Sequence, residues 1–397
     1  MNRDDFLMLN QDIIYFDNGA TSLKPTQVVD QICEYYECYS ANAHRGDYDS
    51  SLIVDMKYEG AREKVREFIH AQSAKEIIFT SGTTDSMNQI VFGFFENQLQ
   101  AGDEVLITKS EHASNVLPWF ALAKRIGCKI SYIPLDEELK VTVDNVKKAI
   151  TDRTKVISLA QITNVVGDIR PIKEISQLAH QSGIKLVVDG AQSTPHIPVD
   201  VQDLDVDFFA FSGHKMCGPT GIGVLYGKQD YLEQVVPLRY GGGMNADFEG
   251  VGDYQLTELP SRLEAGTPNI AGALGLGAAI DYLNSIGMET IETYTQKLKQ
   301  YALSRLAELD NVEVYNATAE GAIIAFNVKG IFSQDTAVYL NNYHICVRAG
   351  SHCAKMLKET MPIKNTCRIS FYFYNTIEEI DRFIEALDTD DIIERII

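Results

Sequence analysis

The sequence lacks the features that mark several special classes of protein. No apolar run approaches the length of about 18 residues that a membrane-spanning helix needs, and no low-complexity tract interrupts the chain. The first five residues, MNRDD, do not show the basic-then-apolar order of a signal peptide. We therefore expect a cytoplasmic protein with no membrane association, and we expect neither disorder nor a fibrous architecture.

Cysteine pairs of the CxxC type are missing, and basic residues are scarce. The 7 cysteines are scattered, and an odd number in a long chain favours reduced thiols over a disulfide framework. We expect no metal site. The 35 Lys and Arg residues face 55 Asp and Glu residues, which gives a net charge of -20. This charge argues against nucleic acid and anionic membranes as partners.

The composition is otherwise that of an ordinary globular protein, since 45% of the 397 residues are hydrophobic and 23% are charged. That length supports a large core and two domains. Strand-like apolar runs alternate with helical spacing in the first half, which predicts a parallel sheet with helices on both faces. The expected strands are 76–80, 104–108, 155–160, 185–189 and 208–211, and the expected helices are 51–71, 113–125 and 171–182.

The second half reads as an α+β pattern. Residues 241–266 are rich in glycine, acids and turn formers, which predicts a long loop between two domains. We assign a large domain to 20–260 and a small domain to 1–19 with 261–397. Beyond the loop, the expected helices are 271–285 and 289–309, and the expected strands are 312–315, 322–328, 345–348 and 367–371.

One lysine stands where an apolar strand ends. Residues 208–215 read FFAFSGHK, so Lys215 follows a strand with Ser212 and His214 beside it. A lysine in this setting is how many enzymes hold pyridoxal phosphate (PLP) as a Schiff base next to its phosphate. Taken alone, the pattern also describes a surface lysine.

An acid ends the preceding strand. The run 185–189 shows no alternation, as expected of a strand buried on both faces, and it closes with Asp189. A carboxylate beside the pyridine nitrogen of PLP keeps that nitrogen protonated, although an acid in this place can also cap a turn. Gln192 follows, with an amide that could reach the ring hydroxyl. Parallel sheets bind ligands at the carboxyl ends of their strands, so Asp189 and Lys215 together predict one cofactor site.

Motifs along nearly the whole chain carry a family resemblance. They are YFDNGA (15–20), AHRG (43–46), GTT (82–84), EH (111–112), TNVVG (163–167), DGAQ (189–192), FSGHK (211–215), EAGTPN (264–269) and RAGSHC (348–353). With these motifs and this layout, the chain resembles the class V aminotransferase-fold PLP enzymes, and more narrowly the SufS-like group of cysteine desulfurases and selenocysteine lyases. The resemblance implies an α/β protein of PLP-dependent transferase fold type I, with a mainly parallel seven-stranded sheet in the large domain and a smaller α+β C-terminal domain.

The resemblance also implies a set of cofactor contacts. Lys215 would bind the cofactor covalently and move the substrate proton, and His112 would stack on the pyridine ring. In relatives, the threonine that corresponds to Thr267 reaches the phosphate of the partner subunit, which implies a homodimer. The cofactor-binding residues implied are Thr83, Thr84, His112, Asn164, Asp189, Gln192, Ser212, His214, Lys215 and Thr267.

The activity implied is the conversion of L-cysteine to L-alanine, with a persulfide formed on Cys353. We expect this thiol on a turn after a strand, where positive charge from Arg348 and His352 would favour the thiolate. Arg368 resembles the family arginine that binds the substrate carboxylate, with Asn164 and Arg348 on the same side. The sulfur would pass to an acceptor protein for iron-sulfur cluster or related cofactor assembly.

Other activities fit the same sequence. A selenocysteine lyase or cysteine sulfinate desulfinase would use the same fold and depend less on the thiol. Transamination of a small amino acid is a further alternative, although it has no use for a nucleophilic thiol at Cys353. A non-catalytic scaffold is opposed by the intact Lys215 and Asp189. We interpret the remaining cysteines as structural, including Cys217, two residues beyond Lys215.

Overall fold

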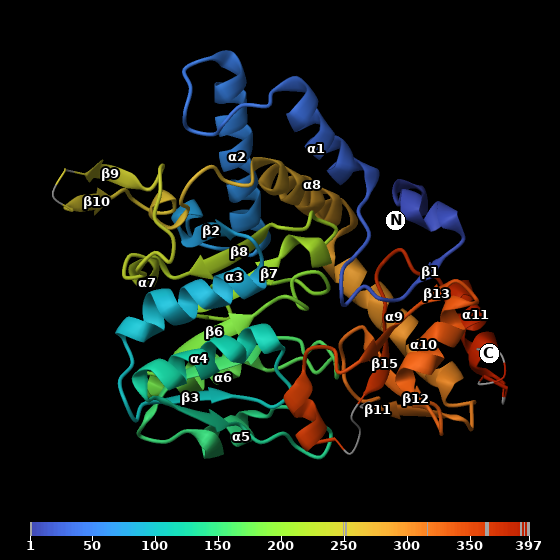
Figure 1. The fold of residues 1–397 in the computed structure, drawn as a ribbon. Helices are drawn as coiled ribbons and strands as arrows, with labels where there is room; N and C mark the ends of the chain where they lie inside the picture. Colours follow the sequence, from blue (N-terminus) through green and yellow to red (C-terminus); the bar gives the residue numbers. More distant parts are fainter. Residues whose placement is uncertain are drawn as a thin grey trace.

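A seven-stranded mixed sheet forms the centre of the larger part of the molecule (Figure 1). The computed structural model describes residues 2–248, 250, 252–315, 317–361, 365–389, 391–392 and 394. Neighbouring strands are parallel except where β8 pairs with β2 and β7, so the predicted mainly parallel sheet is confirmed. In sheet order the strands are β2 (Ile77–Thr80), β8 (Gly223–Gly227), β7 (Phe208–Ser212), β6 (Lys185–Asp189), β5 (Thr154–Ala160), β3 (Glu104–Ile107) and β4 (Lys129–Tyr132).

The central strands are apolar because both faces of the sheet are covered. Along β6, Leu186 and Val188 pack into one core cluster, whereas Val187 packs into the cluster on the opposite face. In β7, Phe209 and Phe208 divide between the two clusters in the same way. Each such side chain contributes about 1.5–3 kcal/mol when it leaves water. This two-sided burial explains why the strands show no alternation in the sequence.

Helices supply the two covering layers. Residues of α1, α2, α5, α6 and α8 pack into one cluster, and residues of α3, α4 and α7 pack into the other. All three predicted helices are present. The helix expected at 51–71 is α2, the one at 171–182 is α6, and the one at 113–125 is a short 3-10 turn followed by α4. The helices are α1 (Thr26–Cys38), α2 (Asp49–Phe68), α3 (Thr83–Asn88), α4 (Leu117–Ile126), α5 (Val143–Ala149), α6 (Ile172–Gln181), α7 (Gln229–Leu232) and α8 (Ile270–Ile286).

The C-terminal part forms a second, antiparallel sheet with its own core. Its strand order is β11, β12, β15, β14, and α9, α10 and α11 pack against it. Near the N-terminus, β1 (Ile14–Tyr15) pairs in parallel with β13 (Ile345–Cys346), which joins the N-terminal segment to the C-terminal part. The elements are α9 (Met288–Leu306), β11 (Val312–Tyr315), β12 (Ile323–Val328), α10 (Ser333–Asn341), β14 (Arg348–Gly350), β15 (Thr366–Ser370) and α11 (Ile377–Leu387).

The domain boundaries at residues 20 and 260 stay a prediction. The predicted loop 241–266 contains a feature that the sequence did not indicate, an antiparallel hairpin of β9 (Asn245–Phe248) and β10 (Tyr254–Leu256). This hairpin extends away from the body of the molecule (Figure 1), and its strands of 4 and 3 residues are too short for their alternation to stand out in the sequence. Among the described residues, no helix is both long and apolar enough to cross a membrane.

Candidate active site

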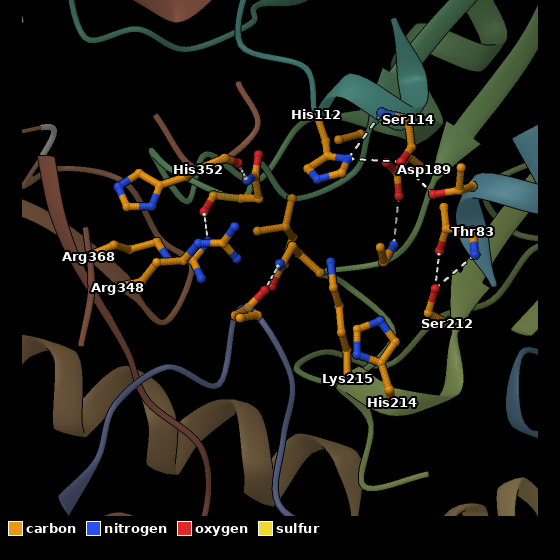
Figure 2. A pocket seen from close by; sticks show the side chains of 18 residues that line it. Thr83, His112, Ser114, Asp189, Ser212, His214, Lys215, Arg348, His352 and Arg368 are labelled. Atoms are coloured by element: carbon orange, nitrogen blue, oxygen red, sulfur yellow. Dashed lines mark hydrogen bonds between the residues drawn. The ribbon is translucent and has the colours of Figure 1, made fainter. Parts of the chain in front are cut away.

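A cavity of about 180 Å³ lies at the carboxyl ends of β5, β6 and β7 (Figure 2). Its walls come from both sheets and from the N-terminal segment that contains Gly19 and Ala20. Nearly all predicted site residues line it; Cys353 and Thr267 do not. The lining residues are Gly19, Ala20, Thr83, Thr84, His112, Ser114, Ala160, Ile162, Asn164, Asp189, Ala191, Gln192, Ser212, His214, Lys215, Arg348, His352 and Arg368.

Lys215 enters the cavity from a 3-10 turn, Gly213–Lys215, that directly follows β7. Burial lowers the pKa of its amine to about 8, and the carboxylate of Asp189 opposes this shift. The amine forms no hydrogen bond with another described residue. A lysine with this pKa is partly neutral near pH 8, which is the form that attacks a carbonyl carbon.

Asp189 lies at the end of β6 and is buried. Its Oδ1 accepts a hydrogen bond from the Ala191 backbone N–H at 2.9 Å. Burial raises the pKa of the carboxyl group, whereas the positive charge of Lys215 lowers it. Asp189 and Lys215 thus lie in one cavity as a buried acid and a buried base, as the sequence predicted.

Hydroxyl and backbone donors gather at the other end of the cavity. The backbone N–H of Thr83 donates to Ser212 Oγ at 2.8 Å, and Thr83 Oγ1 lies 2.8 Å from the same atom. Gly82 precedes them with a φ of 147°, and a Cβ on Gly223 would come within 2.4 Å of its Cα. Glycine is required here because the two backbones approach so closely. The resulting group of donors is suited to an anion such as a phosphate.

His112 caps the short turn before α4. The Ser114 backbone N–H donates to His112 Nδ1 at 3.1 Å, so in the neutral ring Nε2 carries the proton. Burial lowers the pKa of His112 to about 4, with further contributions from Lys215 and two arginines. The ring is therefore neutral near pH 7. Ser114 Oγ also contacts Thr84 Oγ1 at 2.7 Å, which links this turn to α3.

Two arginines form the side of the cavity that faces the small sheet. Arg368 on β15 is buried; its Nη2 donates to Asp17 Oδ1 at 3.0 Å, and its Nη1 donates to the Asn164 carbonyl at 2.8 Å. Its Nε and Asn164 Oδ1 have no partner among the described residues. Arg348 is close by on β14 (Figure 2). This wall offers donors to a carboxylate.

Cys353 lies on a turn just after β14, as predicted, and is exposed. Its Sγ is 3.9 Å from Arg348 Nη2. Both His352 and Cys353 have positive φ angles, 49° and 60°. The turn is held by Asn164 Nδ2, which donates to the His352 carbonyl at 2.7 Å, and by the Ala113 N–H, which donates to the Cys353 carbonyl at 2.8 Å.

The predicted contribution of His352 to the charge near the thiol is wrong. Burial and the nearby arginines lower the pKa of His352 to about 3, so the ring is neutral. Its Nε2 lies 3.0 Å from the Thr366 carbonyl, to which it donates. The sequence placed His352 beside the thiol but gave no sign that the ring is buried. The charge next to Cys353 therefore comes from Arg348.

A cluster of donors that no sequence pattern indicated lies behind Lys215. The carbonyl of His214 accepts hydrogen bonds from Lys24 Nζ at 3.0 Å, Thr21 Oγ1 at 2.9 Å and the Ser22 N–H at 3.0 Å. Burial lowers the pKa of Lys24 to about 8, and no carboxylate pairs with it among the described residues. Lys24 therefore holds the N-terminal segment against the turn that carries Lys215.

A second unpredicted group supports His112. Glu111 and Arg170 form a fully buried ion pair. The Ala160 N–H and Asn115 Nδ2 each donate to Glu111 Oε2 at 2.8 Å. This pair ties the loop after β3 to the end of β5. The sequence signal was present in the motif EH at 111–112, but nothing in it identified Arg170 as the partner.

Thr267 lies outside the main cavity. It lines a separate hollow of about 140 Å³ together with Tyr58 and Glu264. The guanidinium of Arg62 anchors this segment through donors at 2.7 and 2.9 Å to the two Glu264 oxygens. Asn42 Nδ2 contacts Thr267 Oγ1 at 3.3 Å. Thr267 thus cannot complete the cavity of its own chain.

The family model described as "Aminotransferase class-V" matches residues 14–383 of the chain. The chain belongs to the class-V aminotransferase family. This class-V chain is 46% identical over 388 residues to a probable cysteine desulfurase of Halalkalibacterium halodurans. The matched region covers 96% of this chain and 95% of that protein.

Solved structures show the same relationship for this class-V chain. The apo cysteine desulfurase of Thermococcus onnurineus NA1 superposes with a TM-score of 0.93 at 39% identity, covering 97% of this chain and 96% of that one. A cysteine desulfurase of Escherichia coli gives a TM-score of 0.92 at 36% identity and covers 99% and 97%. The predicted fold, PLP-dependent transferase fold type I, is thereby confirmed.

The class-V family implies PLP as cofactor, and the cavity residues fit this group. Gln192 Oε1 is buried and has no partner among the described residues, while Gln192 Nε2 donates to the Gly19 carbonyl at 2.7 Å. The cavity combines this free polar atom with a buried acid, a lysine of lowered pKa and a group of hydroxyl donors. These are the groups needed for a pyridine nitrogen, an aldehyde and a phosphate.

Proposed function

We propose that the chain is a cysteine desulfurase that uses PLP to convert L-cysteine to L-alanine and keeps the released sulfur as a persulfide on Cys353. The observation that carries the proposal is the position of Arg348. It lines the cavity that holds Lys215 and Asp189, and it also contacts the exposed thiol at 3.9 Å. A transaminase would gain nothing from a thiol at this place.

The proposed cofactor contacts follow from the cavity. Lys215 would bind PLP covalently, Asp189 would pair with its ring nitrogen and His112 would cover its ring. When bound, the cofactor supplies an electron sink for the charge that develops on the substrate Cα. The other residues proposed to hold it are Thr83, Thr84, Asn164, Gln192, Ser212 and His214 from this chain and Thr267 from a partner subunit.

The chain's own groups would then act on the substrate. Arg368 would bind the carboxylate, since its guanidinium is planar and its Nε is free, and Asn164 would assist it. Lys215 Nζ would take the Cα proton and later return one. The Cys353 thiolate would attack the substrate sulfur, forming an S–S bond as the C–S bond breaks, and the carbon product would leave as alanine.

The wider proposal includes a homodimer in the cytoplasm and a sulfur-acceptor protein for iron-sulfur cluster or related cofactor assembly. The location of Thr267 supports the dimer, because a residue facing its own surface hollow is available to a neighbouring cavity.

The test is alanine release from L-cysteine, measured with PLP and reductant for the wild type, Cys353→Ser and the control Cys38→Ser. Cys38 is exposed on α1, away from the cavity. We expect release by the wild type and the control and a loss of at least about a hundredfold in Cys353→Ser. Equal release by all three proteins would contradict the thiol assignment and favour a selenocysteine lyase or cysteine sulfinate desulfinase.

A further inference from the structure

The surface around Cys353 has a charge opposite to that of the whole protein. The chain carries a net charge of -20. In contrast, residues 345–361 contain Arg348, Lys355 and Lys358 but only one acid, Glu359. The Glu359 carboxylate lies 2.9 Å from Lys109 Nζ, so a lysine from the large sheet's loop neutralises it. The segment that carries the thiol therefore has an excess of positive charge.

The two lysines are free to attract a partner. Both lie on the 3-10 helix Lys355–Glu359, which begins two residues after Cys353, and both are exposed. Neither forms an ion pair with a described residue. Together with Gly350, Ser351 and His352 they line a small hollow beside the thiol turn. Their charge is thus directed to solvent at this turn.

The backbone that carries the two lysines is held beside the thiol turn. The carbonyl groups of His352 and Cys353 are anchored by Asn164 and Ala113. Leu357 packs with Val165 and Val166 in a core cluster beneath the 3-10 helix. Both lysines therefore project from one anchored segment, and a patch of like charge steers an oppositely charged molecule toward it.

We propose that Arg348, Lys355 and Lys358 form a cationic rim that brings an acidic sulfur-acceptor protein to Cys353. The inference rests on the proposed function. The acceptor thiolate would attack the outer sulfur of the Cys353 persulfide and form an S–S bond with it. The bond between that sulfur and Cys353 would break, and Cys353 would leave as a thiolate, so the transfer needs no oxidant or reductant. The negative charge elsewhere on the chain would keep the acidic acceptor from other surfaces.

The first test measures the local potential without relying on activity. The holoenzyme is alkylated with iodoacetate, an anion, or with iodoacetamide, which is neutral, and the rate at each cysteine is followed by mass spectrometry. The ratio of the two rates corrects for accessibility. Cys38 is the internal control, since it is exposed and follows Glu37 on α1. We expect the iodoacetate to iodoacetamide ratio to be at least about threefold higher at Cys353 than at Cys38.

Charge-reversal variants distinguish the effect of the rim lysines on the alkylation ratio from the effect of the protein's net charge. In Lys355→Glu/Lys358→Glu we expect the ratio at Cys353 to fall to that of Cys38. The matched control, Lys124→Glu/Lys297→Glu, makes the same charge change at exposed positions on α4 and α9 and should leave the ratio unchanged. A ratio at Cys353 equal to that at Cys38, or one that the rim variant does not alter, would overturn the proposal.

The second test measures sulfur transfer from the persulfide of the holoenzyme to a synthetic peptide with one cysteine flanked by glutamates or by lysines. We expect faster transfer to the acidic peptide, a difference that salt weakens and that the rim variant reverses. Transfer that is equal for both peptides would refute the rim. If no persulfide forms at all while the alkylation ratio behaves as expected, the proposed function fails: the positive potential at Cys353 is then established, and its role in sulfur transfer is refuted.

Discussion

The buried amine of Lys215 makes a prediction about stability that can be worked out from its environment. Burial lowers the pKa of this amine from 10.5 to about 8. A shift of this size corresponds to about 3 kcal/mol, at about 1.4 kcal/mol per unit, for keeping the charged amine in the folded protein. Because Lys215 Nζ makes no hydrogen bond with a described residue, its removal costs little. We expect Lys215→Met, freed of cofactor, to be about 3 kcal/mol more stable than the wild type at pH 7.

The pH dependence gives the sign of the effect. Since the folded pKa lies below the unfolded one, the unfolded chain binds more protons between pH 8 and pH 10.5. The stability of the wild type therefore rises with pH through this window. The advantage of the methionine variant is full below pH 8 and fades toward pH 10.5.

Urea unfolding of both proteins at two pH values, below and within this window, measures the effect. Lys299→Met is the matched control, because burial also lowers the pKa of Lys299 to about 8. Lys299, however, donates to the carbonyls of Ala319 and Gly321, and unpaired carbonyls cost about 1–3 kcal/mol each. We therefore expect Lys299→Met to be no more stable than the wild type. The prediction is wrong if Lys215→Met is no more stable than the wild type at pH 7, or if its gain in the free energy of unfolding is the same at both pH values.

Two further predictions concern the residues that support the cavity. Arg170→Met removes the partner of buried Glu111, and we expect a loss of about 3–5 kcal/mol in urea unfolding; a loss below about 1 kcal/mol would show that the pair contributes little. Lys24→Met removes one of the three donors to the His214 carbonyl, and we expect kcat for alanine release to fall about tenfold with KM unchanged, while Lys24→Arg restores part of it. An unchanged kcat would contradict a positioning role.

The chemistry-bearing residues could be predicted because they follow simple rules of position. Lys215 and Asp189 end neighbouring buried strands, and the carboxyl ends of parallel strands meet at one edge of a sheet. Cys353 comes after a strand with an arginine nearby. In each case the reactive side chain and the end of its strand are adjacent in sequence, so a local sequence pattern is sufficient to predict the position of the side chain.

The supporting contacts could not be predicted in this way. Lys24 meets the His214 carbonyl, and Glu111 meets Arg170, across long separations along the chain. No local pattern marks such a pair, because its members belong to different loops. The same limit applies to the pairing of β1 with β13: a strand was expected at 345–348, but its partner β1 has two residues and is too short for any periodicity. The neutral state of His352 depends on burial, which only the assembled fold creates.

Cationic side chains from both sheets line the same cavity. Lys215 comes from the large sheet, while Arg348 and Arg368 come from the small one, and all three line one cavity. Each arginine lowers the pKa of Lys215, so the charges repel one another. Asp189 and Asp17 offset this repulsion only in part. An anion placed between the walls would be attracted by all three cations, and any ligand that binds the folded state alone stabilises it. An anionic group bound between the two walls would therefore stabilise the folded state in addition to filling the cavity.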